Sequence, residues 1–214
     1  MKRLLSYIYP VTKTIESKYS GKLEITWYNG KKHLNSANAN YSYGSLQRIL
    51  KFGLKKINLS RINSVLILGL GGGSVIETLR QDFNYPGQIE AVEIDPVIID
   101  IAKTEFGIDK NDTLKIHCAD AYEFVKDHSK TFDLIIVDLY IDLDVPNKFL
   151  DFEFWNNILE LKNSSGSIIF NAAVKVSKAD KIISISNYLK TKVFNVEFYD
   201  NVNNTNTVII AKGL

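Results

Sequence analysis

The sequence predicts an α/β fold with a seven-stranded, mostly parallel sheet, on three observations. From residue 64 onward, short apolar runs alternate with segments of helical periodicity. The early runs are apolar throughout, which is typical of strands buried on both faces of a parallel sheet. The last two runs are joined by the Asn-rich turn Asp200 to Asn204, with no helix between them. We therefore expect the sheet to end in an antiparallel β-hairpin.

The strand candidates lie at residues 65–70, 88–93, 113–117, 134–138, 166–171, 193–199 and 207–211. The helix candidates lie at residues 73–81, 97–106, 121–126, 149–161 and 178–190. Pro96 falls in the first turn of the second helix, where its missing N–H costs no hydrogen bond. Five βα units followed by a terminal hairpin give the element order of the class I methyltransferase fold, a Rossmann-like architecture.

A short β-hairpin is expected nearer the N-terminus. Asn29-Gly30 is the preferred two-residue hairpin turn, and it joins two arms at 22–28 and 31–34. Apolar residues alternate along the first arm, at Leu23, Ile25 and Trp27. Residues 42–56 then fit an amphipathic helix. We expect two parts: a small N-terminal β-hairpin region at 1–40 and a Rossmann-like nucleoside-binding catalytic domain at 41–214.

Composition excludes several classes of protein. The chain has 214 residues, of which 23% are charged, and a formal net charge of +2. Its Lys and Arg are spread along the chain, so nucleic acid is not an expected partner. No apolar stretch reaches the roughly 20 residues of a membrane-spanning helix, so no membrane partner is expected either. The single cysteine, Cys118, fits a reducing, cytoplasmic location, and the three scattered histidines predict no metal site.

A glycine-rich turn and a following acid predict a nucleoside site. Gly69, Gly71 and Gly73 follow the first strand and open a helix, where backbone N–H groups can approach a ligand. Glu93 ends the second strand about 20 residues later, at the spacing of an acid that binds ribose hydroxyls. The alternative for Glu93 is a surface acid at a strand end. Asp95, two residues on, is as well placed to cap the helix that begins at Pro96.

Acids follow the third and fourth strands as well. Asp120, before Ala121, fits two roles: a helix N-cap and an acceptor for the exocyclic amine of a base. Asp138 ends a buried apolar run, so it should face either solvent or the crevice at the sheet edge. We favour the crevice, where Asp138 would be a catalytic or substrate-orienting acid. Tyr140 and Asp142 follow in an acidic loop, where a solvated loop is the alternative.

Tyr43 and Gln47 lie between the hairpin and the cofactor domain, where a substrate lid would stand. Simple packing is the alternative for both residues, since the chain has 11 tyrosines.

Residues 65–74, 91–98, 119–125 and 132–140 resemble the polyamine aminopropyltransferases, the spermidine synthase-like family. The resemblance implies a transferase that binds S-adenosylmethionine or its decarboxylated form, with a small acceptor such as an amine, no metal, and a homodimer. It implies that Gly69, Gly71, Gly73, Glu93, Asp120 and Ala121 bind the cofactor. It also implies that Asp138, assisted by Tyr140, takes a proton from the amine. The residues expected to contact the substrate are Tyr43, Gln47 and Asp142.

Two departures from the family pattern affect the reaction. The family loop typically carries an aspartate where this chain has Gly72, and a loop acid favours a donor that has lost its carboxylate. The family's next signature, Asp-Ser-Ser-Asp-Pro, aligns with residues 138–142, and its second aspartate falls on Ile141 unless Asp142 replaces it after a shift of one residue. These changes favour intact S-adenosylmethionine and methyl transfer. Aminopropyl transfer, a non-catalytic nucleoside-binding module and a nicotinamide dehydrogenase remain as alternatives.

Overall fold

The computed structural model describes residues 2–36, 40–42, 44–108, 112–141, 144–172, 178–192 and 195–213, with the backbone alone at 40–42 and 45. Its larger sheet has seven strands in the order β10-β11-β9-β8-β5-β6-β7. The strands are β5 (Ser64–Leu68), β6 (Gln88–Glu93), β7 (Leu114–Cys118), β8 (Phe132–Val137), β9 (Lys162–Ala172), β10 (Asn195–Val202) and β11 (Asn206–Lys212). The five strands from β9 to β7 run parallel, whereas β10 and β11 form an antiparallel hairpin beside β9. The predicted fold class is confirmed.

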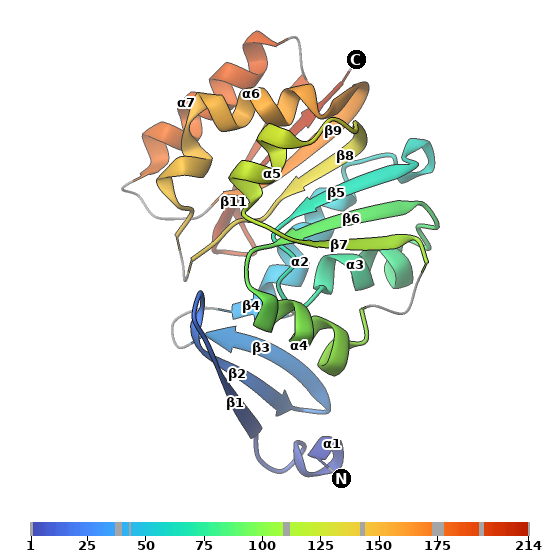
Figure 1. The fold of residues 1–214 in the computed structure, drawn as a ribbon, viewed down its shortest axis with the longest axis vertical. Helices are drawn as coiled ribbons and strands as arrows, with labels where there is room; N and C mark the ends of the chain where they lie inside the picture. The colour runs from blue at the N-terminus through green and yellow to red at the C-terminus, as the bar shows by residue number, and fades with distance from the viewer. Residues whose placement is uncertain are drawn as a thin grey trace.

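Helices cover both faces of this sheet, which gives three layers (Figure 1). They are α2 (Ser45–Leu54), α3 (Ser74–Glu77), α4 (Pro96–Phe106), α5 (Ala121–Asp127), α6 (Phe152–Glu160) and α7 (Ala179–Thr191). Side chains alternate along each strand, so Leu66 and Leu68 face α5, α6 and α7, while Val65 and Ile67 face α2, α3 and α4. Continuous apolar strands therefore fill two separate cores.

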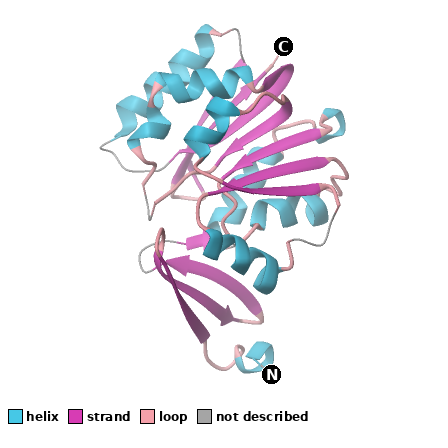
Figure 2. Cartoon of the chain, viewed as in Figure 1, coloured by secondary structure: helices cyan, strands magenta, loops and turns pink. Residues whose placement is uncertain are grey.

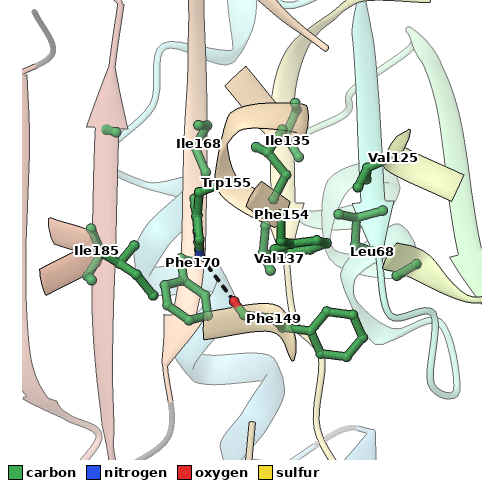
Figure 3. Packing of buried hydrophobic residues seen from close by; sticks show 14 of the residues in the cluster. Leu68, Val125, Ile135, Val137, Phe149, Phe154, Trp155, Ile168, Phe170 and Ile185 are labelled. Carbon is green, nitrogen blue, oxygen red and sulfur yellow. Dashed lines mark hydrogen bonds between the residues drawn. The ribbon is translucent and has the colours of Figure 1, made fainter. Parts of the chain in front are cut away.

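The core under α6 is rich in aromatic rings (Figure 3). Trp155 is fully buried and tilts against Phe170 of β9, with ring centroids 4.9 Å apart. Its indole N–H donates to the carbonyl oxygen of Phe149 at 3.1 Å, so the one polar atom of this ring is satisfied. The packing fixes β8 and β9, whose carboxyl ends carry part of the site described below.

Two predicted helices differ in detail from those observed. The helix expected at 73–81 is an α-helical turn, α3, that continues as a π-helix over Thr78–Asp82. The helix expected at 149–161 is divided into a 3₁₀ turn at Asn147–Leu150 and α6. The division occurs at Asp151, whose side chain accepts the N–H of Phe154 and so begins a new helix.

The N-terminal part is larger than a hairpin. The predicted arms are β2 (Gly21–Tyr28) and β3 (Lys31–Ser36), but β1 (Val11–Ser17) and β4 (Asn40–Ser42) add to them in a four-stranded antiparallel sheet. Figure 2 shows this smaller sheet apart from the larger one. Sequence reasoning missed β1 because its side chains are mostly exposed and give no clear alternation. A short helix, α1 (Lys2–Leu5), precedes it.

The smaller sheet packs on α4. Leu23, Ile25 and Leu34 form one buried cluster with Ile98 and Ile101 of that helix. The contact secures the sheet beside the end of β6. In the part of the chain that the structure describes, no helix is long and apolar enough to cross a membrane.

Candidate functional site

The carboxyl ends of β5 and β8 meet where the strand order of the larger sheet reverses. β6 and β7 extend from one side of this pair and β9 from the other. The N–H of Asp138 donates to the carbonyl oxygen of Leu68 at 2.9 Å, and a Cβ at Gly69 would overlap the carbonyl oxygen of Asp138. Open α/β sheets bind ligands at such a reversal, so the predicted glycine turn and the predicted acid share one candidate site.

The glycine turn needs glycine for two physical reasons. Gly69, Gly71 and Gly73 have φ angles of +97°, +52° and +82°, which residues with a Cβ rarely adopt. A Cβ at Gly73 would also collide with the side chain of Ile108. Part of the glycine pattern is thus explained by packing, whereas Gly71 presents its N–H to an acid.

That acid is Glu93, at the end of β6. One oxygen of its carboxylate accepts the N–H of Gly71 at 3.2 Å, and the other accepts the N–H of Asp95 at 3.1 Å. Burial raises the pKa of Glu93 to about 7, against the effect of these hydrogen bonds. The structure thus brings Glu93 to the glycine turn, as the spacing predicted.

Asp95 serves the scaffold. Its side chain is completely buried, and Oδ1 accepts the N–H of Val97, which caps α4. Oδ2 accepts the hydroxyls of Ser17 and Ser20 at 2.5 and 2.6 Å. The predicted cap is confirmed, and it also joins the smaller sheet to the end of β6.

Asp120 follows β7 and caps α5. Its Oδ1 accepts the N–H of Tyr122 at 2.8 Å, and Oδ2 forms an ion pair with Lys148. Ala121 begins the helix and is buried. The capping role of Asp120 is confirmed. The role of a base acceptor stays a prediction, and Lys148 is a cation that the sequence reasoning did not associate with it.

Asp138 and Tyr140 belong to a network of amides. Asn171, at the end of β9, donates from Nδ2 to Asp138 at 2.8 Å. Asn206, at the start of β11, donates to Asn171 Oδ1 at 2.9 Å and to the Tyr140 hydroxyl at 3.2 Å. The Tyr140 hydroxyl itself donates to the backbone oxygen of Asn171 at 2.9 Å. Burial raises the pKa of Asp138 to about 6 and that of Tyr140 well above its usual value.

Sequence reasoning missed Asn171 and Asn206. A signal for Asn171 was present, since it is the polar residue that ends the predicted strand at 166–171. Asn206 gave none, because it follows an Asn-rich turn in which any polar residue is expected. Its pairing with Asn171 depends on β11 lying beside β9.

The predicted substrate residues are less well defined. The Gln47 side chain donates to the Thr78 hydroxyl at 3.1 Å, which joins α2 to the π-helical turn. Tyr43 and Asp142 lie outside the described residues. Asp144 pairs with Lys178 at 2.7 Å, and Lys178 also donates to the carbonyl oxygen of Val145. Among the residues described, no three His, Cys, Asp or Glu side chains gather as metal ligands would.

Comparison with known proteins places this geometry in context. The spermine/spermidine synthase domain matches residues 48–205. An eEF1A lysine and N-terminal methyltransferase of Danio rerio is 27% identical over 64% of this chain, and a polyamine aminopropyltransferase of Vibrio vulnificus is 32% identical over 50%. The chain covers only 23% and 36% of those two relatives.

Solved structures show the same fold. Spermidine synthase from Thermotoga maritima has a TM-score of 0.69 at 14% identity, over 94% of this chain and 72% of its own. Human methyltransferase-like protein 13 in complex with SAH has a TM-score of 0.64 at 22% identity, over 80% of this chain and 83% of its own. At these low sequence identities the structural likeness supports the fold only. The reaction has to be inferred from the geometry of the site.

Proposed function

This chain belongs to the spermine/spermidine synthase family, and on that premise we propose that it is a transferase that uses S-adenosylmethionine and moves its methyl group to an amine. One observation carries the proposal: the glycine turn, Glu93 and Asp138 meet at the reversal point of the sheet. The names of the two relatives both denote transfer to an amine, on lysine or on a polyamine. The exposed thiol of Cys118 suits the cytoplasm, where we place the reaction.

The chain's own residues fit such a donor. Glu93 is a carboxylate turned toward the glycine turn, and a carboxylate has about four acceptor positions, three of which are used by the backbone N–H groups of Gly71, Ile94 and Asp95. The position that remains would accept a hydroxyl of the ribose. Asp120 would accept the adenine amine on an oxygen that it shares with Lys148. The N–H groups of Gly69, Gly71 and Gly73 already donate to Val92, Glu93 and Leu70, so the turn would serve the rest of the donor by the close approach to the backbone that glycine permits.

Asp138 provides the proton acceptor. S-adenosylmethionine, when bound, supplies a methyl carbon on a positively charged sulfur. An alkylamine with a pKa near 10 is mostly protonated at pH 7, and freeing it costs about 4 kcal/mol. A carboxylate with a pKa of about 6 is mostly ionised at that pH, yet it is a stronger base than an exposed aspartate. Asp138 would orient the ammonium group and take one of its protons, which frees the nitrogen lone pair for the attack that follows.

Two features favour methyl transfer over aminopropyl transfer. The glycine turn has no acid at Gly72, so the turn itself carries no charge that repels the carboxylate of intact S-adenosylmethionine. In the loop after Asp138, the carboxylate of Asp144 already holds the ammonium of Lys178. The distal ammonium of a diamine could pair with Asp144 only by displacing that lysine. Aminopropyl transfer stays the second candidate, because several polyamine aminopropyltransferases are 30–33% identical to this chain.

Calorimetry tests the proposal. We would titrate the protein with S-adenosylmethionine, its decarboxylated form, methylthioadenosine and NAD, and assay transfer to primary amines. Tighter binding of intact S-adenosylmethionine with transfer of its methyl group supports the proposal. Preference for the decarboxylated form would point to aminopropyl transfer, binding without turnover to a non-catalytic module, and binding of NAD alone to a dehydrogenase.

A variant of the glycine turn sharpens this test. Gly72→Asp restores the family acid, and Gly72→Asn is its neutral control of the same size. One charge contact at about 4 Å is on the order of 4 kcal/mol at an effective dielectric of 20. Even a third of that value would move the affinity ratio about tenfold toward the decarboxylated donor. Equal ratios in the two variants would contradict the electrostatic explanation of donor choice.

A further inference from the structure

The strongest unexplained feature of the site is the chain of amides behind Asp138. It runs from β11 through β9 to the end of β8, over residues that are 33 and 35 apart in the sequence. Asn171, in the middle, is completely buried, and Asn206 is partly buried. A buried amide is costly unless its donors and acceptor are used, and here both Nδ2 and Oδ1 of Asn171 have partners.

The network fixes which way the central amide points. Asn206 donates to Oδ1 of Asn171, so the NH₂ group of Asn171 has to face the other way. There it meets Oδ1 of Asp138, which is an acceptor when the carboxyl group is ionised. The amide donates to Oδ1 alone, so this hydrogen bond does not engage the second carboxylate oxygen of Asp138.

The same two asparagines hold the hydroxyl of Tyr140. Its proton is directed to the backbone oxygen of Asn171, and it accepts the amide N–H of Asn206. A phenol committed in this way is a poor proton acceptor. Tyr140 therefore acts on the reaction through the asparagines and not by touching the proton.

We propose that Asn171 is a positioning residue for the proton acceptor Asp138, and that Asn206 and Tyr140 lock Asn171 in the orientation that this role requires. The inference rests on the proposed function, in which Asp138 takes the proton of the acceptor amine. The amide holds one carboxylate oxygen, favours the ionised form and aims the other oxygen at the amine. Without the amide, Asp138 stays protonated to a higher pH.

The effect of the Asn171 amide on the pKa of Asp138 can be distinguished from the effects of the other groups around that carboxyl group. Among the residues that the structure describes, Tyr140 is a titratable side chain that interacts electrostatically with Asp138. Gly69 from the end of β5, and Asn171 and Asn206 from the neighbouring strands, carry no charge. Burial opposes ionisation of Asp138, and the Asn171 amide is the group that works against burial.

Three variants test the proposal. Asn171→Leu keeps the shape of the side chain and removes the donor. Asn206→Leu removes the group that fixes the amide. Thr207→Val is the matched control, because Thr207 neighbours Asn206 on β11 and its hydroxyl donates to Asp200, away from Asp138. Urea unfolding verifies that each variant is folded.

The readout is the carboxyl titration of Asp138, followed by ¹³C NMR and assigned by its absence in Asp138→Asn. We expect the titration to move upward by about one pH unit in Asn171→Leu, less in Asn206→Leu, and not at all in Thr207→Val. The acid limb of the pH–rate profile should move with it.

An unchanged titration in a folded Asn171→Leu protein would overturn the inference. If that variant does not fold, Asn206→Leu decides, and an unchanged titration there overturns it equally. Binding of S-adenosylhomocysteine is measured in parallel. A wild-type protein that does not bind S-adenosylhomocysteine would reject the proposed function, whereas the titration of Asp138 tests the role of the amides independently of that binding.

Discussion

The glycine side of the site lies at the ends of β5, β6 and β7, and the asparagine side at the ends of β8 and β9 and the start of β11. The two sides are held by different kinds of hydrogen bond. On the glycine side, backbone N–H groups of Gly71, Asp95 and Tyr122 donate to carboxylates. On the asparagine side, side-chain amides donate to a carboxylate, to another amide and to a phenol.

The two sides should differ in how strongly a single side-chain substitution disturbs their hydrogen bonds. A backbone donor survives most substitutions, so the glycine side depends on its acids and on the conformation of its glycines. The asparagine side loses a donor whenever an amide is replaced. We therefore expect substitutions on the glycine side to change affinity or stability, and substitutions on the asparagine side to change rate and pH dependence.

The largest effect is expected for Asp138→Asn. A positioned general base contributes about 10²–10⁴-fold to a rate, so methyl transfer should fall within that range. Since the pKa of Asp138 is raised to about 6, the wild-type rate should rise with pH through about 6, as the carboxyl group loses its proton. That limb should be absent in the variant.

Steady-state kinetics between about pH 5 and 8 measure this effect, with calorimetry of S-adenosylhomocysteine as the control. If Asp138→Asn lowered the affinity for S-adenosylhomocysteine in proportion to the rate, the proposed difference between the glycine side and the asparagine side would be contradicted.

Gly69→Ala should cost about 3 kcal/mol or more of stability. An alanine here would have to adopt a left-handed backbone conformation, which costs about 1–2 kcal/mol. Its Cβ would also overlap the carbonyl oxygen of Asp138. Gly21→Ala is the matched control, because Gly21 has a φ of +63° and open space around its Cβ position. It should cost only the backbone term of about 1–2 kcal/mol.

Urea unfolding compares these two glycines. Equal losses would show that the close approach between the two sides of the site adds nothing to stability.

Glu93→Ala should weaken nucleoside binding by roughly 1.5–3 kcal/mol at a pH well above the Glu93 pKa of about 7, where the carboxyl group is ionised and its hydrogen bonds have the value of those to a charged group. The rate at saturating donor should change much less, because Glu93 lies on the glycine side. Glu93→Gln keeps one acceptor and should retain part of the affinity. Calorimetry with S-adenosylhomocysteine measures both variants, and wild-type affinity in Glu93→Ala would remove Glu93 from the site.

The smallest effect is expected for Ser17→Ala. It removes one of the two hydroxyls that donate to buried Asp95, so unfolding should become easier by about 1 kcal/mol while Ser20 still donates. Thr12→Ala, which removes an exposed hydroxyl of the same strand, should stay within about 0.5 kcal/mol of wild type. A loss of nucleoside affinity in Ser17→Ala would show that the smaller sheet also supports the end of β6.

The sequence by itself determined the seven-stranded sheet, the glycine turn and the strand-end acids Glu93, Asp120 and Asp138. These depend on local rules: continuous apolar runs form buried parallel strands, left-handed turns need glycine, and acids cap helices. Local rules also explain the errors. The pattern at 149–161 predicts one continuous helix and gives no sign of the new helix that begins at Asp151. The strand β1 was missed because it has no alternating pattern.

Only the tertiary structure decided what surrounds those acids. Lys148 beside Asp120, the serines on Asp95, and Asn171 with Asn206 behind Asp138 are all brought there by strands and loops distant in the chain. The pairing of β11 with β9, and not the residues next to Asn206 in sequence, gives that amide its partner. A hydrogen bond between side chains far apart in the chain leaves no periodic pattern, so it becomes visible only when the sheet order is known.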